Sequence, residues 1–474
     1  MKEKNIRLLS NTAIFTVGKF VSKLIVIFML PFYTSCLSNA QYSTADLITN
    51  LCNLIIPIAA LGVGEGIFRE AAGKSQDKEE FFTNGIVIML FGTLAVAAIS
   101  PLLLLIDTFS PYILLIIGYI ISSNIHSVCS QYVCAIGKTK LFAAQGILNT
   151  MITVGFNIIF LAGFSMGVEG YVLSILLGDL LSAVFVFFYA RLYRAIQPRK
   201  INMDTIKTLL RFSLPLVPST VFWWITSVSD RYMVAFMRSE AENGLYAVAY
   251  KIPTLLTYVV TIFNDAWKLS AASDSDVESE RVGFYSQTYK YYQSIMFMGG
   301  AALCFGSWII SRILFAEAFR SAWVLVPILT VATVFTALDT FLGSAYFTVR
   351  KTSMSLYTSL LGAVVNIALN ILLIGKYGAM GASVATFISY FVVFVVRAVT
   401  MKRFIPFKLY PVKTAVNTVL ICATAITVTF YGTILAGMLI AAMLCAVSLI
   451  YNGRDILGAL RSAIAGIRKK GKRA

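Results

Sequence analysis

Long apolar runs separated by short polar connections make up most of the chain. A window of about 19 residues identifies about 14 such runs, each longer than the roughly 17 residues that a helix needs to cross a bilayer. The first six predicted spans cover 8–33, 43–68, 81–106, 111–136, 141–164 and 170–193. The others cover 207–236, 244–268, 285–310, 321–348, 354–374, 379–403, 412–431 and 434–451. The pattern predicts an all-α polytopic membrane protein with about 14 transmembrane helices.

The composition agrees with this pattern and excludes several other classes of protein. Hydrophobic residues occupy 58% of the 474 positions and charged residues only 13%, whereas soluble proteins carry about 25% charged residues. A soluble enzyme, a disordered chain and a disulfide-stapled secreted domain are therefore excluded. The seven cysteines are scattered, nearly all of them through apolar runs, which argues against a disulfide framework.

Lysine and arginine are distributed very unequally between the two sides of the predicted membrane. Of the 39 residues, the segments on the side of the N-terminus hold 31, the opposite side holds five, and three lie within spans. Because cytoplasmic loops are the ones enriched in Lys and Arg, both termini are predicted to be cytoplasmic. Topology and contact with anionic membrane lipids then explain the net charge of +17, and nucleic acid is not an expected partner.

The connections between the spans hold no soluble catalytic domain, so an enzyme is not expected. On the outer side they are short, as at 107–111 and 237–243, which also weakens the hypothesis of a membrane-embedded glycan polymerase or ligase. After residue 453 the chain is basic, and Ile456, Leu460 and Ile467 share one helical face. This is typical of an amphipathic helix on an anionic membrane surface.

The two halves of the chain are similar to each other. Lys138 and Thr139 recur as Lys351 and Thr352, and Asn157 recurs as Asn370, at an offset of 213 positions; 167–170 matches 378–381, and 38–40 matches 239–241. Six spans per half place both halves in the membrane in the same sense, as in transporters with a central cavity. The predicted organisation is two pseudo-symmetric six-helix lobes (1–200 and 201–405), an additional helix pair (406–452) and a basic cytoplasmic tail (453–474).

Several motifs resemble those of one transporter family. They are Ser213–Pro218, Ser229–Met233, Glu242–Tyr246, Leu61–Arg69, Phe263–Trp267 and Asn370–Gly381. With them the chain resembles the polysaccharide transporters, the oligosaccharide-lipid flippases (O-antigen, Wzx-type) of the multidrug/oligosaccharidyl-lipid/polysaccharide (MOP) exporter superfamily. The resemblance implies a prokaryotic cytoplasmic (inner) membrane, an undecaprenyl-pyrophosphate-linked glycan as cargo, and alternating access between two lobes.

Cations within the predicted spans are the first candidates for binding such a cargo. Lys19 and Lys23 are four residues apart and share a helical face, and Lys19 lies roughly 16 Å along the first span. A lysine at that depth costs about 2.5–3.5 kcal/mol, so the pair is predicted to line a cavity, as the basic residues of the first helix do in the relatives. Lys251 either joins this anion site or extends to the interface. Arg231 is a further candidate, although a local ion pair with Asp230 is the simpler interpretation.

Acids within the spans are candidates for coupling transport to H⁺ or Na⁺, because the chain has no nucleotide-binding loop. They are Asp46, Asp230 and Asp339, with Asp179 and Asp265 in the same class, and His126 is the sole histidine. His126 and Asp339 are 213 positions apart and so occupy equivalent places in the two halves. They either form a proton site across the pseudo-axis or are each satisfied within their own lobe.

Two further groups of residues bear on gating and on metal binding. Glu65 and Arg69 lie at a cytoplasmic helix end, as a structural pair or a gate. His126, Cys129 and Cys134 do not share a helical face, so no metal site is expected.

Pro215, Pro218 and Pro253 are expected to bend their helices. No cofactor beyond a coupling H⁺ or Na⁺ is expected.

The function predicted is a flippase that moves an undecaprenyl-pyrophosphate-linked oligosaccharide from the inner to the outer leaflet for cell-surface polysaccharide assembly. Partners implied by the resemblance are membrane lipids, a glycan polymerase and other assembly proteins. A lipid II flippase for peptidoglycan precursors carries nearly the same cargo and stays open as an alternative. A cation-coupled multidrug exporter of the same superfamily also stays open, although mid-membrane lysines do not suit a site for organic cations.

Overall fold

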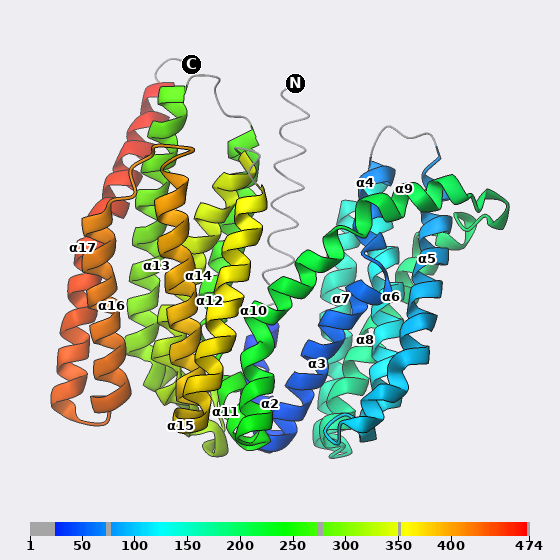
Figure 1. Ribbon diagram of the computed structural model, residues 1–474, viewed down its shortest axis with the longest axis horizontal. Helices are drawn as coiled ribbons and strands as arrows, with labels where there is room; N and C mark the ends of the chain where they lie inside the picture. Colours follow the sequence, from blue (N-terminus) through cyan, green and yellow to red (C-terminus); the bar gives the residue numbers. More distant parts are fainter. Residues whose placement is uncertain (1–23, 73–76, 273–277, 349–351, 472–474) are drawn as a thin grey trace. The chain divides into compact units, whose positions relative to one another are not determined.

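The computed structural model describes residues 24–72, 77–272, 278–348 and 352–471, and within them the regular elements are helical (Figure 1). The chain divides into two compact units, Met1–Val228 (unit 1) and Ser229–Ala474 (unit 2). The boundary falls inside the helix α10 (Leu216–Met237). Each unit is described on its own below.

Unit 1 contains the helices that follow the first predicted span. In chain order they are α2 (Leu30–Cys36), α3 (Asn39–Ala59), α4 (Val63–Ala72), α5 (Lys78–Ile99), η1 (Ser100–Leu105), η2 (Ser110–Tyr112), α6 (Ile113–Ala135), α7 (Thr139–Asn157), the π-helical η3 (Ile158–Gly163), α8 (Gly167–Tyr189), η4 (Leu192–Arg194), η5 (Pro198–Lys200) and α9 (Met203–Ser213). α6 packs against α7 and α8, and α9 packs against α4 and α5. The stacked rings of Phe82 and Tyr132, with centroids 4.2 Å apart, lie in the core between α5 and α6.

Unit 2 contains the longest helices. They are α11 (Glu240–Ala249), α12 (Thr254–Ala272), α13 (Glu278–Leu314), η6 (Glu317–Val324), α14 (Val326–Thr348), α15 (Thr352–Met401), α16 (Pro411–Tyr431) and α17 (Leu435–Gly471). Its core is rich in buried aromatic rings of α13 and α14, among them Tyr289, Tyr292, Phe335 and Phe341. α17 runs as one helix through the segment in which the sequence predicts a separate basic tail.

Nine stretches of the described residues are long and apolar enough to cross a membrane, or up to eleven if each of two bent helix pairs is one span. The bent pairs are α3 with α4, at 54°, and α11 with α12, at 47°. α15 covers two predicted spans. The chain turns at Gly378 (φ 56°, ψ −137°), and the residues on both sides of that turn are helical. Most of the first predicted span lies outside the described residues.

Prolines account for two of the interruptions within predicted spans. The predicted span 207–236 is divided into α9 and α10 at Leu214 and Pro215. Pro253 lies in the break between α11 and α12. A proline has no backbone N–H to donate within a helix, which explains why each helix restarts after it.

Large apolar side chains on several helices are more exposed than is usual for a protein in water. Phe91 is 72% exposed, Leu114 is 81% exposed and Leu435 is 73% exposed. Large apolar side chains exposed along several helices mark surfaces that contact another phase or partner. Together with the length of the helices, it fits a surface in contact with lipid tails.

The helices α16 and α17 lie side by side and are tied to α13 within unit 2 (Figure 1). Asp455 of α17 accepts hydrogen bonds from Lys290 of α13, at 2.6 Å, and from Lys413 of α16. One turn away, the amides of Asn417 and Asn452 bond to each other in both directions, at 3.0 and 2.8 Å. The C-terminal pair is therefore held by buried polar contacts as well as by apolar packing.

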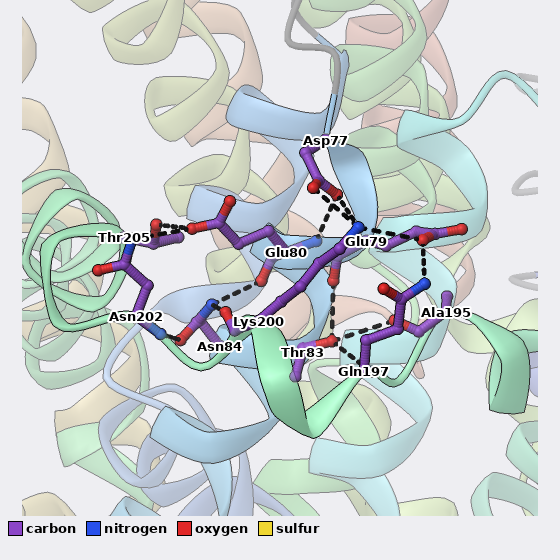
Figure 2. A network of polar contacts seen from close by, with 10 residues as sticks. All are labelled: Asp77, Glu79, Glu80, Thr83, Asn84, Ala195, Gln197, Lys200, Asn202 and Thr205. Carbon is purple, nitrogen blue, oxygen red and sulfur yellow. Dashed lines mark hydrogen bonds and ion pairs between the residues drawn. The ribbon is translucent and has the colours of Figure 1, made fainter.

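The connection from α8 to α9 is bound to the start of α5 by a polar network (Figure 2). Lys200 lies 2.8 Å from Asp77 and 3.5 Å from Glu79. Asn84 donates to the carbonyl of Lys200, at 2.9 Å, and accepts from the backbone N–H of Asn202, at 2.9 Å. Further members of the network are Glu80, Thr83, Ala195, Gln197 and Thr205. The network explains why unit 1 extends past residue 200, where the sequence alone places the end of the first lobe.

The charged part of this network is expected to be insensitive to pH near neutrality. The hydrogen bond from Lys200 lowers the pKa of Asp77, so its stabilising effect is present above about pH 3.9 and is lost as the pH falls further. The same bond raises the pKa of Lys200, so that effect is present below about pH 10.4 and is lost as the pH rises further. Hydrogen-exchange protection of residues 195–202 should therefore stay constant between about pH 5 and pH 9.

Replacing Lys200 by methionine should speed that exchange only by roughly two- to fivefold, because solvent screens an exposed pair. Lys207→Met is the matched control, since Lys207 lies on α9 and pairs with the exposed Asp204, at 3.6 Å. An equal change in both variants would show that Lys200 has no special role in holding the connection.

Candidate functional site

Unit 1 brings together a set of polar side chains from three helices that are candidate spans. His126 of α6 lies with its Nδ1 3.4 Å from Oδ1 of Asp179 of α8. Its Nε2 lies 2.6 Å from Oε1 of Gln145 of α7. Asp179 also accepts from Asn149, at 2.7 Å, and from the hydroxyl of Ser123. We call these five residues the His126 cluster.

Helical spacing explains how the His126 cluster assembles. Ser123 and His126 are three apart on α6, and Gln145 and Asn149 are four apart on α7, so each pair shares a face. Gly178, next to Asp179, allows a close approach of α8 to α7, because a Cβ there would lie 2.0 Å from the hydroxyl of Thr153. The sequence identified His126 and Asp179 but missed Gln145 and Asn149, although the spacing of these two was a readable signal.

Asp46 lies elsewhere in unit 1, buried on α3. Its carboxylate accepts from the side-chain amide of Asn50, one turn later, at 2.9 Å. The backbone carbonyl of Asn50 in turn accepts a hydrogen bond from the indole N–H of Trp224, at 2.8 Å. Asp46 is thus part of a local hydrogen-bonded chain.

In unit 2, Asp230 of α10 is 2% exposed and is surrounded by hydroxyl groups. It accepts from the hydroxyl of Tyr246 of α11, from Thr386 of α15 at 3.1 Å, and from the backbone N–H of Arg231 at 2.9 Å. The guanidinium of Arg231 lies over the ring of Tyr250, 5.2 Å from its centroid. Asp230 and Arg231 therefore occupy one buried polar region of unit 2.

Asp339 of α14 pairs with a basic residue of α15. Arg397 of α15 is 5% exposed and places its Nε 3.0 Å from Oδ1 of Asp339. It also donates to the hydroxyls of Thr358 and Ser359, each at 2.9 Å. Gly343 leaves room for the guanidinium, since a Cβ there would lie 2.4 Å from Nη1. His126 and Asp339 each have a charged partner within their own unit.

The other sequence-predicted site residues lie at helix ends or outside the described part. Lys19 and Lys23 fall within residues 1–23, outside the described residues. Lys251 lies in the break between α11 and α12, partly buried. Asp265 lies in α12, whose side chains from residue 265 onward are outside the described part. None of these residues is placed by the structure in a contact with the His126 cluster.

Glu65 and Arg69 contact different partners in the described geometry. Glu65 of α4 accepts from the amide of Gln131 of α6, at 3.4 Å. Arg69 lies 3.6 Å from Glu70 and stacks over the ring of Phe212 of α9, at 4.3 Å. The residues are four apart on one helix, but the ring of Phe212 and the neighbouring Glu70 draw Arg69 away from Glu65.

Two of the repeated sequence motifs contact each other in unit 2. The Glu242 carboxylate accepts from the backbone N–H of Ala379, at 2.7 Å, and pairs with Arg238, at 3.2 Å. Arg238 also donates to the carbonyl of Gly375, at 3.4 Å. The two side chains therefore bond to backbone groups on both sides of the turn at Gly378, and we call this arrangement the Glu242 latch.

Unit 1 has a simpler version of the latch. Ser38 and Gln41 form a reciprocal capping box on α3, and a Cβ on Gly167 (φ 59°) would lie 3.0 Å from the Gln41 amide nitrogen. Gln41 is equivalent to Glu242 in the repeat, and Gly167 is equivalent to Gly378. The recurring motifs therefore lie at the same corner of each half.

Replacing Gly378 by alanine is expected to destabilise the protein by more than about 2 kcal/mol. The backbone there has a positive φ, which costs an L-residue about 1–2 kcal/mol, and a Cβ would lie 1.8 Å from the Glu242 carboxylate. The thermal midpoint in detergent measures the effect. Gly375→Ala is the matched control, because a Cβ at Gly375 meets open space; equal midpoints for the two variants would contradict the latch.

Comparison with known proteins gives a family and a fold. A family model described as "Polysaccharide biosynthesis protein" matches residues 8–267. An uncharacterized membrane protein of Methanocaldococcus jannaschii is 23% identical over 328 residues, which are 62% of this chain and 76% of that protein.

Solved structures of transporters share the fold at low sequence identity. The lipid II flippase MurJ in an inward closed conformation is 15% identical, with a TM-score of 0.64 over 94% of this chain and 99% of that one. A MATE multidrug resistance transporter of the MOP superfamily in an inward-facing conformation is also 15% identical, with a TM-score of 0.64 over 81% and 98%. The predicted all-helical polytopic membrane fold is confirmed.

Proposed function

Because the chain belongs to the polysaccharide biosynthesis protein family, we propose that it is a flippase for a lipid-linked oligosaccharide. The cargo is an oligosaccharide on undecaprenyl pyrophosphate, moved from the inner to the outer leaflet of the cytoplasmic membrane by alternating access. The observation that carries the proposal is the family match, which covers 8–267 and so includes all six predicted spans of the first lobe. The MOP fold supports it, because its solved members include a flippase for a lipid-linked sugar.

The cargo combines a charged pyrophosphate, a polar glycan and a lipid tail. Charge inside a membrane needs a polar cavity with opposite charge, because an unpaired charge in hydrocarbon costs several kcal/mol. In this proposal Lys19 and Lys23 hold the pyrophosphate, and Lys251 and Arg231 extend the cationic surface. The bent pairs α3–α4 and α11–α12 supply interrupted helices of the kind that transporters place at binding sites.

Orientation and partners follow from the same proposal. The excess of Lys and Arg in the segments on the N-terminal side supports cytoplasmic termini. Arg69, stacked on Phe212 between α4 and α9, and Glu65 are gate candidates on that side. A glycan polymerase and other assembly proteins would receive the flipped cargo.

A lipid II flippase is the second candidate, and the extent of the fold match to MurJ favours it. Both cargoes carry a polyprenyl pyrophosphate, so the cationic residues alone do not separate the two. The difference lies in the sugar-contacting surface. A multidrug exporter is the third candidate on the basis of the MATE fold.

Binding by purified protein tests the proposal before any transport is measured. Native mass spectrometry in detergent should retain an undecaprenyl-pyrophosphate oligosaccharide, and an equal amount of lipid II should compete poorly. A cationic dye should not compete. Tighter retention of lipid II would favour the second candidate, and displacement by the dye alone would contradict a glycan-lipid cargo.

A further inference from the structure

The His126 cluster in unit 1 has a counterpart in unit 2. His126 and Asp339 are equivalent in the internal repeat, and so are Gln145 and Thr358, at the same offset of 213 positions. Gln145 bonds to His126, and Thr358 accepts from Arg397, the partner of Asp339. Each half therefore contains one pair of an acidic and a basic side chain that joins two equivalent helices. In each half, a polar side chain of a third helical segment bonds to the basic member of the pair.

The two pairs differ in one chemical property. An arginine stays protonated at any pH that a folded protein meets, so the cation of the Asp339–Arg397 pair is permanent. A histidine changes charge between about pH 5 and pH 8. The cation-forming partner of the pair in unit 1 can therefore gain and lose a proton, whereas the cation of its counterpart in unit 2 is fixed.

The hydrogen bonds around His126 specify where that proton binds. Oε1 of Gln145 is an acceptor, so the Nε2 of His126, 2.6 Å away, carries a hydrogen. Nδ1 of the neutral ring then faces Oδ1 of Asp179 across 3.4 Å. That carboxylate already accepts from Asn149 and Ser123, which stabilise its charged form. Two acceptors thus face each other with no hydrogen between them, and one proton fits at Nδ1.

Other charged or titratable groups on the helices packed against α6 have their own partners or lie at helix ends. α3 carries Asp46, which bonds to Asn50, and α4 carries Glu65, which bonds to Gln131. α7 carries Lys140 in its first turn, and the carboxylates of α5 lie in the network at its start. Remaining titratable groups on α3, α4, α6 and α8 are Tyr42, Cys52, Arg69, Glu70, Tyr119, Cys129, Tyr132, Cys134, Glu169, Tyr171 and Tyr189. Among the described residues, Asp179 is the ionic partner of His126.

We propose that His126 and Asp179 form the proton-binding site through which this transporter uses a proton gradient. The proposal rests on the transport function proposed above. A proton entering from one side of the membrane binds Nδ1 and converts the 3.4 Å contact into a charge-assisted hydrogen bond of about 2.7–2.9 Å. The same proton leaves on the other side, so no further reactant is needed.

This exchange changes the attraction between two helices at the middle of their spans. α6 and α8 are drawn together when the proton is bound and are released when it leaves. The side chains of His126 and Asp179 are 19% and 14% exposed, so the site is open enough for a proton to reach it. The charge change at His126 thereby biases the packing of α6, α7 and α8.

The sole histidine makes the site directly measurable, because ¹⁵N-histidine labelling gives the signals of a single ring. In detergent, those signals should show that Nδ1 is the nitrogen that gains the proton as the pH falls. Asp179→Asn should move the titration midpoint to lower pH, since the imidazolium loses its counter-charge. Asn149→Ala should move it to higher pH, because the carboxylate loses a donor. An unchanged midpoint in both variants would overturn the proposal.

Transport in liposomes tests the coupling separately. An imposed pH gradient should accelerate movement of the undecaprenyl-pyrophosphate oligosaccharide by wild type, and His126→Gln should lose that acceleration at least tenfold. Arg397→Lys is the control in the equivalent pair and should keep it. Full acceleration in His126→Gln would overturn the proposal, even if the ring titrates. Absence of cargo movement in wild type, with the expected titration, would overturn the transport function and leave the proton site intact.

Discussion

Replacing Arg397 by alanine is expected to destabilise the protein by about 3–5 kcal/mol, because the variant leaves Asp339 as a buried charge without its partner. Arg397 is 5% exposed and also donates to Thr358, Ser359 and two backbone carbonyls. The loss should appear as a strongly reduced yield of monodisperse protein in detergent and a lower thermal midpoint.

Two further variants separate the ion pair from simple packing. Arg397→Lys retains a cation and should recover part of the stability. Asp339→Leu combined with Arg397→Met replaces the pair by apolar side chains and should be more stable than Arg397→Ala alone, because no unpaired charge is buried. A thermal midpoint of Arg397→Ala equal to that of wild type would contradict the buried pair.

Lys19→Ala combined with Lys23→Ala is expected to slow translocation by more than about 100-fold. Each lysine is proposed to bond to the pyrophosphate, and a hydrogen bond to a charged group contributes about 1.5–3 kcal/mol, so two losses exceed two orders of magnitude in rate. Membrane insertion should be retained, since removing charge from an apolar span favours insertion. The initial rate of cargo movement in liposomes measures the effect.

The control for that experiment has the same change of charge outside the membrane. Lys138 lies in the connection between α6 and α7, Lys140 lies in the first turn of α7, and both are exposed. Their double alanine variant should translocate at nearly the wild-type rate. Equal losses in the two double variants would indicate a general effect of net charge, and an active Lys19/Lys23 variant would contradict the assignment of the site.

The fold class was predictable because apolar length and repeat structure are properties of the sequence itself. Long runs without charge give spanning helices, and the recurrence of 167–170 at 378–381 marked the turn at which both latches form. Pro215 and Pro253 indicated where helices bend. These signals depend on residues close together in the sequence, and they determine the backbone conformation at the same positions.

The pairing of the charged residues was not predictable in the same way. Spacing of three or four residues places Ser123 with His126 on one face, but it does not say which helix that face meets. The partner of His126 is Asp179, 53 positions away, and the partner of Asp339 is Arg397, 58 positions away. Arg397 lies near the end of its predicted span, so a count of basic residues assigned it to the cytoplasmic connection although its side chain is buried.

The most direct test of the central claim is leaflet movement of the cargo. Purified protein would be reconstituted with a fluorescent undecaprenyl-pyrophosphate oligosaccharide, and an impermeant quencher would report the fraction in the outer leaflet over time. The account predicts protein-dependent movement of this lipid that a pH gradient accelerates. No movement of it, together with gradient-driven efflux of a cationic dye from the same liposomes, would contradict the account and favour a multidrug exporter.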